Sequence, residues 1–281
     1  MKLDEARAKS KAIWDDMAEG WERQSDYIWE ASRPVGEWMV DRLDPKPGQT
    51  ILELAAGPGI TGFGAARLVG ESGKLISTDF SPQMVEVARR TAGKLGVTNA
   101  EFRVMDAEKM DLPDDSIDGV LCRWGYMLMM DPASALAETR RVLGPGGGVA
   151  LSVWGTPQDN PWASMPGMIM VTLGLMEMPD PKAPGSIFSM SERDVIESLL
   201  KDAGFESIDV APMPVTWRFG DFPELWSFLI ELAGPIALTI RTLKEESIAI
   251  VKKTLQEQAK QFFRDGEGYV FPGVALNVIA R

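Results

Sequence analysis

Histidine is absent from all 281 residues of this chain. Its absence excludes Ser-His-Asp and Cys-His catalysis, histidine-ligated zinc and the commonest general base of enzymes. A reaction carried out by this protein must therefore rely on a bound cofactor, on carboxyl groups or on the placement of the reactants.

Cysteine and long apolar runs are scarce as well. The single cysteine, Cys122, excludes an intramolecular disulfide and any metal site built from several cysteines, so we expect no metal. No apolar run approaches the ~18–20 residues that span a bilayer. The opening residues, MKLDEARAKSKAIW, are highly charged and lack the apolar core of a signal peptide. We therefore predict a cytoplasmic protein without a membrane span.

Basic residues are outnumbered by acidic ones, 29 against 41, which gives a formal net charge of −12. Because an acidic chain is a poor partner for phosphate backbones, we expect no nucleic-acid partner. The apolar fraction is 45%, and the length suits one large α/β domain with or without a lid. Nothing in the sequence indicates an oligomeric state.

Short apolar strands alternate with helices from residue 50 onward. This alternation predicts right-handed crossovers and a parallel, doubly wound α/β sheet. Ser81 is expected to cap one helix with Pro82 at its first position, and a capping-box pattern at Ser191 predicts another helix up to Ala203. The predicted strands are 50–54, 74–79, 100–105, 117–122, 148–154, 205–210 and 269–280.

Three segments flank or interrupt this alternation. The first forty or so residues are predicted to be helical, with Trp14 and Trp21 on one apolar face. Residues 155–190 are rich in Pro, Gly and Met and predict an inserted cap, and residues 221–264 predict further helix.

A glycine-rich turn follows the first strand. Gly57-Pro58-Gly59-Ile60-Thr61-Gly62 fits the pattern G-x-G-x-x-G, and Asp79 ends the next strand. Glycines permit a tight turn and a close approach of the backbone to a ligand. A carboxylate can accept hydrogen bonds from both hydroxyls of a ribose. The pattern fits a dinucleotide and an adenosyl cofactor equally well.

Three further features favour an adenosyl cofactor that carries an ammonium and a sulfonium group. Glu53 lies four residues before Gly57, where a carboxylate is unfavourable beside a pyrophosphate but acceptable beside cations. Asp106 follows the third strand, where an acid can accept from an adenine amino group. Arg123 and Trp124 follow the fourth strand and reach the same carboxyl edge of the sheet, where ligands of α/β proteins collect.

The ordered motifs resemble class I S-adenosylmethionine-dependent methyltransferases, nearest the ubiquinone/menaquinone-biosynthesis type. The matching segments are Glu53-Leu54-Ala55-Ala56-Gly57-Pro58-Gly59, Asp79-Phe80-Ser81-Pro82-Gln83-Met84, Asp106-Ala107-Glu108, Ile117-Asp118-Gly119-Val120 and Arg141-Val142-Leu143-Gly144-Pro145-Gly146-Gly147. The resemblance implies a Rossmann-like, seven-stranded, mostly parallel sheet with an antiparallel last strand. It also implies S-adenosylmethionine as cofactor and S-adenosylhomocysteine as product.

From the resemblance we expect one methyltransferase domain, 1–281, that consists of three parts. They are an N-terminal helical lid (1–47), a cofactor-binding core (48–155), and a cap with inserted helices and closing strands (156–281). The expected cofactor-binding residues are Glu53, Ala55, Gly57, Gly59, Asp79, Phe80, Met84, Asp106, Ala107 and Arg123. The expected acceptor-binding residues are Trp14, Trp21, Trp124 and Met127.

The residues after the fourth strand and in the cap bear on the methyl acceptor. Methionines crowd the cap and the loop after the fourth strand, which indicates either ordinary core filling or a deformable apolar pocket. Relatives often carry histidines in that loop, and here it is Trp124-Gly125-Tyr126-Met127-Leu128-Met129-Met130, so no catalytic base is assigned. We predict methyl transfer to a small or medium, largely apolar acceptor.

Two other functions are compatible with a cofactor-binding α/β domain. The first is an NAD(P)-dependent oxidoreductase, which Glu53 disfavours and for which none of the three tyrosines has a lysine four residues on. The second is a protein that binds S-adenosylmethionine without catalysis, which would be indicated by a damaged cofactor motif.

Overall fold

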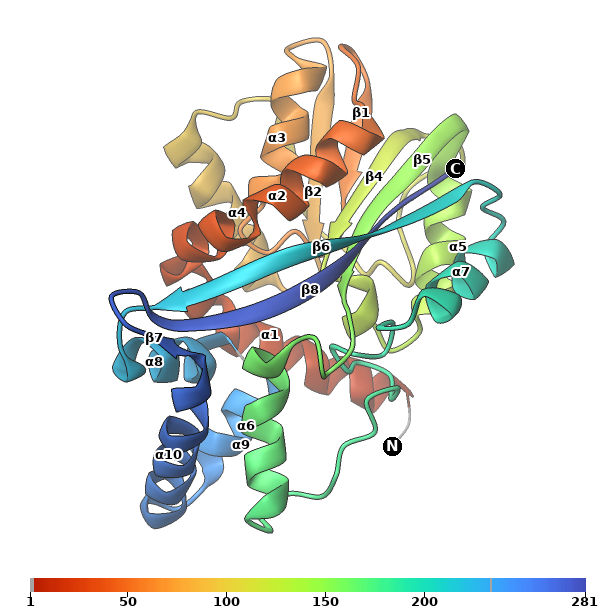
Figure 1. Ribbon diagram of the computed structural model, residues 1–281. Coiled ribbons are helices and arrows are strands. Elements are labelled where there is room, and N and C mark those ends of the chain that lie inside the picture. The colour runs from red at the N-terminus through yellow and green to blue at the C-terminus, as the bar shows by residue number, and fades with distance from the viewer. Residues whose placement is uncertain (1–2, 233) are drawn as a thin grey trace.

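The computed structural model describes residues 3–232 and 234–281, so Met1, Lys2 and Ala233 of the predicted segments lie outside the described residues. Its strands form one sheet in the order β3-β2-β1-β4-β5-β8-β6, with the two-residue strand β7 beside β8 (Figure 1). The first five strands are parallel, and β8 runs antiparallel to both β5 and β6. The predicted mostly parallel sheet with an antiparallel last strand is confirmed. The strands are β1 (Thr50–Glu53), β2 (Lys74–Asp79), β3 (Ala100–Val104), β4 (Ile117–Arg123), β5 (Leu143–Trp154), β6 (Ile208–Phe219), β7 (Phe263–Arg264) and β8 (Gly268–Ala280).

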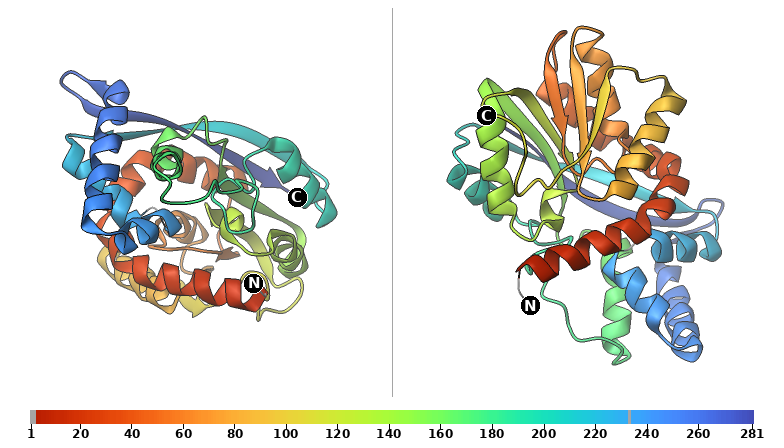
Figure 2. Two further views of the ribbon diagram at one scale, coloured as in Figure 1. Left: turned by 90° about the horizontal axis from the view of Figure 1, so that it is seen from below. Right: turned by 180° about the vertical axis from the view of Figure 1, so that it is seen from behind.

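Helices cover both faces of this sheet. Helix α2 packs against β4, β5, β6, β8 and α3 and lies in front of the sheet in Figure 1, whereas α5 lies in front of it when the molecule is seen from behind (Figure 2). This is the doubly wound arrangement that the alternation predicts. The helices are α1 (Leu3–Arg23), α2 (Ser25–Leu43), α3 (Ile60–Val69), α4 (Pro82–Leu95), α5 (Pro132–Val142), α6 (Pro161–Thr172), α7 (Arg193–Asp202), α8 (Phe222–Leu232), α9 (Pro235–Thr242) and α10 (Glu245–Ala259).

The order of the strands fixes where a ligand can bind. Strand β1 lies between β2 and β4, so the chain leaves β1 in one direction along the sheet and returns to the other side of it. Such a switch point opens a crevice at the carboxyl ends of the two central strands. The glycine-rich turn after β1 and the Arg123-Trp124 segment at the end of β4 both lie at this crevice.

Helix α4 begins and ends as its sequence predicts, whereas helix α7 ends at the predicted place but is not capped as predicted at its start. The Ser81 hydroxyl accepts a hydrogen bond from the Met84 amide at 3.2 Å, Pro82 occupies the first position, and Gly96 ends the helix at φ +67°. For α7, Glu192 is the capping residue and makes no capping hydrogen bond with its side chain. The capping box predicted at Ser191 is therefore wrong, because the Ser191 amide donates to the Phe188 carbonyl in a preceding turn.

Two strands are longer than predicted. Strand β5 begins at Leu143 rather than at residue 148, and β6 continues to Phe219 rather than ending at residue 210. Pro212 and Pro214 hide the continuation of β6, because proline cannot donate to a strand ladder. Since β6 is the last strand of the sheet, one side of it needs no such donor.

The cap lies below the carboxyl edge of the sheet and consists of α6, α8, α9 and α10 (Figure 1). In the predicted cap of residues 155–190, only Pro161–Thr172 is helical. Helix α1 runs between the sheet and these cap helices, as both Figure 1 and the view from behind in Figure 2 show. In the described part of the chain no single helix could cross a membrane, although the bent pair Phe222–Leu232 and Ile236–Thr242 meets the length and composition criteria jointly.

Candidate functional site

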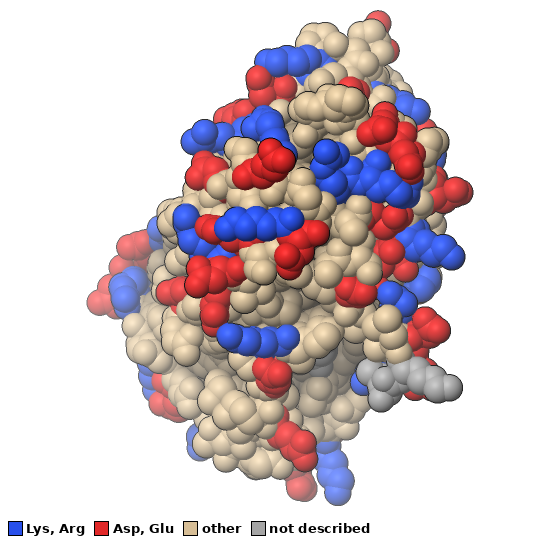
Figure 3. All heavy atoms as spheres, turned by 90° about the vertical axis from the view of Figure 1, so that its right-hand side faces the viewer, with Lys and Arg blue, Asp and Glu red and all other residues tan. Residues whose placement is uncertain are grey.

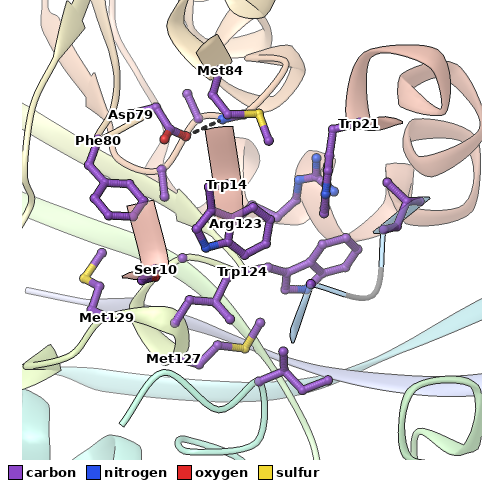
Figure 4. Close-up of a pocket in the computed structure, with 18 of the residues that line it drawn as sticks. Ser10, Trp14, Trp21, Asp79, Phe80, Met84, Arg123, Trp124, Met127 and Met129 are labelled. Atoms are coloured by element: carbon purple, nitrogen blue, oxygen red, sulfur yellow. Dashed lines mark hydrogen bonds between the residues drawn. The ribbon is translucent and has the colours of Figure 1, made fainter. Parts of the chain in front are cut away.

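A cavity opens at the carboxyl edge, between the loops after β1 to β4, helix α1 and the cap (Figure 4). Most of the predicted site residues line it: Ala55, Gly57, Asp79, Phe80, Met84, Asp106, Ala107, Arg123, Trp14, Trp21, Trp124 and Met127. Glu53 and Gly59 are the two predicted residues that do not line it. The sequence motifs of four separate strands are thus brought together around one space.

The turn after β1 has an unusual backbone. Gly57 and Gly59 adopt φ values of +52° and +82°, and Ala55 adopts +49° although it carries a Cβ atom. A Cβ atom on Gly59 would lie 2.6 Å from the Phe63 ring, whereas one on Gly57 would meet no atom within 4 Å. Gly59 is therefore needed for the turn itself, and Gly57 leaves open space at the cavity wall.

Asp79 is held in one orientation at the end of β2. Its carboxylate accepts from the Gly57 amide at 3.1 Å and from the Ser81 amide at 3.0 Å. The side chain is almost completely buried, and this burial raises the pKa of Asp79 to about 6, while the two amide donors oppose the shift. At neutral pH the group is mainly a carboxylate, with lone pairs left for hydroxyl donors.

Glu53 lies behind the turn. Its carboxyl group accepts from the Gly62 amide at 2.7 Å and from the Ser77 hydroxyl at 3.4 Å, and only 2% of the residue is exposed. Burial raises the pKa of Glu53 to about 8. A Cβ atom on Gly62 would lie 2.2 Å from a Glu53 oxygen, which explains the third glycine of the motif. Glu53 is thus placed to hold the turn against the start of α3.

Two acids after β3 have different surroundings. Asp106 is exposed and accepts from the Glu108 amide at 2.9 Å. The Glu108 carboxylate accepts from the Arg7 guanidinium and from the amides of Met130 and Asp131, at 2.7 and 3.0 Å. Glu108 therefore ties α1 to the loop after β4. Sequence analysis missed Arg7, because its partner is 101 residues away and no local pattern marks it.

Helix α1 supplies one wall of the cavity. Trp14 and Trp21 meet edge to face, with ring centroids 6.0 Å apart, and both line the cavity. A second tie fixes this helix: the Ser81 hydroxyl donates to the Asp15 carboxylate at 2.6 Å. The aromatic face predicted from the spacing of residues 14 and 21 thus faces the cavity.

Arg123 enters the cavity from the end of β4. Its Nε donates to the Thr61 hydroxyl at 3.0 Å and its Nη1 to the Ser32 hydroxyl at 2.9 Å. The guanidinium lies 4.6 Å from the centroid of the Trp124 ring, and burial lowers the pKa of Arg123 to about 10. Trp124 has a φ of +61°, a strained conformation for a residue with a bulky side chain.

Aromatic rings form the end of the cavity that faces the cap. Trp124 stacks on Trp154 with centroids 4.2 Å apart, and Trp162 and Trp217 lie 5.0 Å from each other. Phe228 lies 5.0 Å from Trp217. All five rings line the cavity, yet sequence analysis identified only Trp124, because the others come from β5, α6, β6 and α8.

Metal binding and thiol chemistry find no support at this site. Residues 3–232 and 234–281 contain no group of three or more Asp, Glu or Cys side chains that could hold a metal ion. Cys122 is fully buried, and burial raises the pKa of its thiol to about 12. A thiol with such a pKa is not a nucleophile at neutral pH.

Several known proteins are similar to this chain in sequence or in fold. Residues 45–171 match the family described as "Methyltransferase domain". The chain is 30% identical over 173 residues to an arsenite methyltransferase of Halobacterium salinarum, which corresponds to 62% of this chain and 41% of the relative. It is 30% identical over 181 residues to the ubiquinone/menaquinone biosynthesis C-methyltransferase UbiE of Salmonella arizonae, which corresponds to 61% of this chain and 72% of the relative.

Among solved structures, YcgJ from Bacillus subtilis aligns with 88% of this chain and 97% of its own, at a TM-score of 0.60 and 18% identity. This similarity concerns the fold. This chain spans less than half of the arsenite methyltransferase and 72% of UbiE. The relatives and the motif residues around the cavity show that the chain belongs to the class I S-adenosylmethionine-dependent methyltransferases.

Proposed function

We propose that this methyltransferase acts on a small or medium, largely apolar molecule that binds in the cavity between the sheet and the cap. The observation that supports this proposal is the chemical difference between the two ends of the cavity (Figure 4). Carboxylates and a glycine-rich turn form the end near β1 to β3. Tryptophan and methionine side chains form the end near α1, β4 and the cap.

The first end has the groups that S-adenosylmethionine needs. Asp79 can accept from the two ribose hydroxyls, and the open space beside Gly57 lets the backbone approach the ligand. Asp106 and Ala107 line the same end of the cavity and are proposed to contact the adenine ring, and Phe80 and Met84 are proposed to contact the ribose. Glu53 and Gly59 would act by holding the turn. When bound, this cofactor supplies an electrophilic methyl group.

The second end suits an acceptor whose apolar surface is desolvated on binding. Trp21, Trp124 and Met127 line it together with the ring cluster of the cap. Methyl transfer depends mainly on placing the nucleophile in line with the methyl group in a dehydrated site. Helix α1 closes this space on one side, so we propose that it acts as a lid. The methionine side chains can adapt to the shape of an apolar acceptor.

Charge distribution argues against a polyanionic acceptor. The net charge is −12, and acidic and basic side chains are interspersed over the upper part of the face in Figure 3, with fewer charges around the hollow below. A nucleic-acid acceptor would require a basic surface beside the cavity. The two curated relatives are named for an arsenic compound and for quinone biosynthesis, which also supports a small acceptor. The cytoplasmic location stays a prediction.

Binding and transfer assays test this proposal. Calorimetry should show binding of S-adenosylmethionine and S-adenosylhomocysteine and none of NADH or NADPH. Methyl transfer from labelled cofactor should occur to members of a panel of apolar phenols, quinols, thiols and carboxylic acids. It should not occur to RNA or to a denatured protein mixture. Transfer to RNA or protein alone would overturn the proposed acceptor class.

A further inference from the structure

Arg123 is a cation without a carboxylate partner at the cavity wall. Its hydrogen bonds go to the neutral hydroxyls of Thr61 and Ser32, and within the described residues no acidic oxygen lies within 4.0 Å of its guanidinium. The other arginine of the cavity, Arg7, is paired with Glu108. A buried cation is costly unless an anion balances it, so the cavity favours an anionic ligand at Arg123.

Glu53 does not supply that balance. It interacts with Arg123 only at longer range, and its pKa of about 8 keeps the carboxyl group mainly protonated at neutral pH. Glu53 is also held by Gly62 and Ser77 behind the turn, away from the cavity surface. Arg123 therefore has no directly paired carboxylate at the cavity wall.

The acceptor end also lacks a proton acceptor. Among the described residues, the carboxyl groups that line the cavity are Asp79, Asp106 and Glu108. Asp79 and Asp106 lie at the other end, and the Glu108 carboxylate is already occupied by Arg7 and by the amides of Met130 and Asp131. The chain has no histidine. The indole N–H groups of Trp21 and Trp124 are buried and have no hydrogen-bond partner in the structure, and an indole can only donate. Among the described residues, this end of the cavity thus presents the Arg123 cation and no side-chain base.

From these contacts we infer that the acceptor is an apolar carboxylic acid whose carboxylate binds Arg123, and that the product is its methyl ester. The inference rests on the proposed function and names the acceptor class at the same site. A carboxylic acid ionises with a pKa of about 4, so at neutral pH it needs no base to become a nucleophile. A phenol or a carbon acid would require one.

The reaction is balanced without a proton transfer. A lone pair on one carboxylate oxygen forms the new O–CH3 bond, while the S–CH3 bond breaks and its electron pair remains on sulfur. The negative charge of the carboxylate and the positive charge of the sulfonium are both neutralised. The products are a methyl ester and a thioether, and no general base takes part.

The amino-acid portion of the cofactor also carries a carboxylate, which could be the anion at Arg123. The surroundings of Arg123 favour the acceptor. Its guanidinium lies over the Trp124 ring, 4.6 Å from the ring centroid, while its Nε also donates to Thr61 in the glycine-rich turn. An anion at this position would be in contact with the aromatic end of the cavity. Ligands with and without the cofactor's carboxylate distinguish an anion of the cofactor from an anion of the acceptor.

The experiment uses the full chain, labelled S-adenosylmethionine, and the acids 2-naphthoate and dodecanoate with their primary amides. A methyl ester releases volatile methanol in alkali, whereas methyl groups on carbon, nitrogen or a phenol do not. We expect alkali-labile product from at least one acid and none from the amides. In Arg123→Met the rate should fall roughly a hundredfold, the loss of a charge-assisted contact, with affinity for S-adenosylhomocysteine within about threefold.

A matched control is available on the surface. Arg42 lies over the Trp38 ring at 5.5 Å, outside the cavity, so Arg42→Met removes a similar arginine–tryptophan contact and should leave ester formation unchanged. Arg123→Lys, which keeps the charge, should retain more activity than Arg123→Met. If Arg123→Met does not fold, the rate of Arg123→Lys relative to the unaltered protein tests the role of Arg123 instead.

Two results would overturn the inference. The first is the absence of alkali-labile product from both acids, even where phenols or thiols of the panel are methylated, an outcome that leaves the proposed function standing. The second is a loss of about tenfold or more in affinity for S-adenosylhomocysteine in Arg123→Met while 5′-methylthioadenosine, which lacks the carboxylate, binds as before. That result would assign Arg123 to the cofactor. If S-adenosylhomocysteine does not bind the unaltered protein, the proposed function fails as well.

Discussion

Asp79 and Glu53 are two buried carboxyl groups next to the same glycine-rich turn, and they have different surroundings. Asp79 is the last residue of β2 and lines the cavity, whereas Glu53 is the last residue of β1 and lies behind the turn. Asp79 accepts two backbone amides and keeps lone pairs for a ligand. Glu53 accepts from the amide that begins α3. One residue is thus suited to binding and the other to holding the binding loop.

Asp79→Ala should weaken the binding of S-adenosylhomocysteine by roughly ten- to a hundredfold, because charge-assisted hydrogen bonds contribute about 1.5–3 kcal/mol. Calorimetry measures this directly. The matched control is Asp118→Ala, which removes a carboxylate that accepts from the Thr50 amide at 2.7 Å, away from the cavity lining. Equal affinities for the ligand in the folded Asp79 variant and in the control would exclude ribose binding by Asp79.

Glu53 should make stability depend on pH. Its folded-state pKa is raised from 4.5 to about 8, so between these values the folded protein holds a proton that the unfolded chain releases. The stabilisation from this group is therefore present below pH 4.5 and is lost as the pH rises toward 8. Glu53→Gln removes the titration, so its free energy of unfolding relative to the unaltered protein should increase with pH, by at most about 1.4 kcal/mol per pH unit. Denaturant melts at pH 5, 6.5 and 8 measure the difference, and a constant difference across these values would contradict it.

At this scale the sequence predicts residues whose partners are near in the chain. Gly57 and Asp79 are identifiable because a turn, a strand end and an acid occur in a fixed order. Arg7 and Trp217 are not identifiable in this way. Arg7 meets Glu108 only after α1 crosses below the sheet, and Trp217 reaches the cavity only because β6 extends past its two prolines.

Helix α1 is the element that most affects the site without belonging to the sheet. It contributes Arg7, Ser10, Trp14 and Trp21 to the cavity, and it is fixed by contacts with Glu108 and Ser81. The glycine-rich turn and Asp79 come from other elements. Binding of the cofactor and closure of the acceptor end thus depend on different parts of the chain.

Deletion of residues 1–24 should therefore lower turnover by about a hundredfold, since misplacement of a reactant by about 1 Å has effects of that size. Affinity for S-adenosylhomocysteine should change by less than about tenfold, because Gly57, Asp79 and Asp106 remain. The deletion ends before Ile28, which is buried in the main core, so that α2 is kept. Circular dichroism checks the fold, and a folded truncated protein with full turnover would show that α1 is not a lid.

Element boundaries show which local signals are reliable. The hydroxyl cap at Ser81 is found because a proline follows it and a glycine ends the helix. The similar pattern at Ser191 fails because the Ser191 amide, which a capping box pairs with a side chain in the first turn of the helix, donates instead to the Phe188 carbonyl. A local pattern is a weak guide where a neighbouring turn uses the same donor.

At the scale of the whole molecule, β8 joins the cofactor-binding core to the segment that carries the cap, which were predicted from the sequence as separate parts. It lies between β5 of the cofactor-binding half and β6, whose far end carries the cap. Helix α2 also packs across β4, β5, β6 and β8. The amino-acid sequence predicts that residues 269–280 form a strand, and the resemblance to known methyltransferases implies that it is antiparallel, but its place between β5 and β6 comes from the structure. We propose that the chain is one cooperative domain.

A cooperative domain should unfold in one thermal transition that a cofactor shifts as a whole. Tryptophan fluorescence reports nine residues, among them Trp154, Trp162 and Trp217 at the junction of sheet and cap, whereas far-ultraviolet circular dichroism reports all helices and strands. The two signals should coincide. S-adenosylhomocysteine at a hundredfold excess over its dissociation constant should stabilise the fold by about 2.7 kcal/mol and shift both signals equally. NADH should shift neither. If the fluorescence transition stayed in place while the circular dichroism transition moved, the cap would be a separate unit, because a ligand held by β1 to β3 stabilises only the part of the chain that unfolds together with those strands.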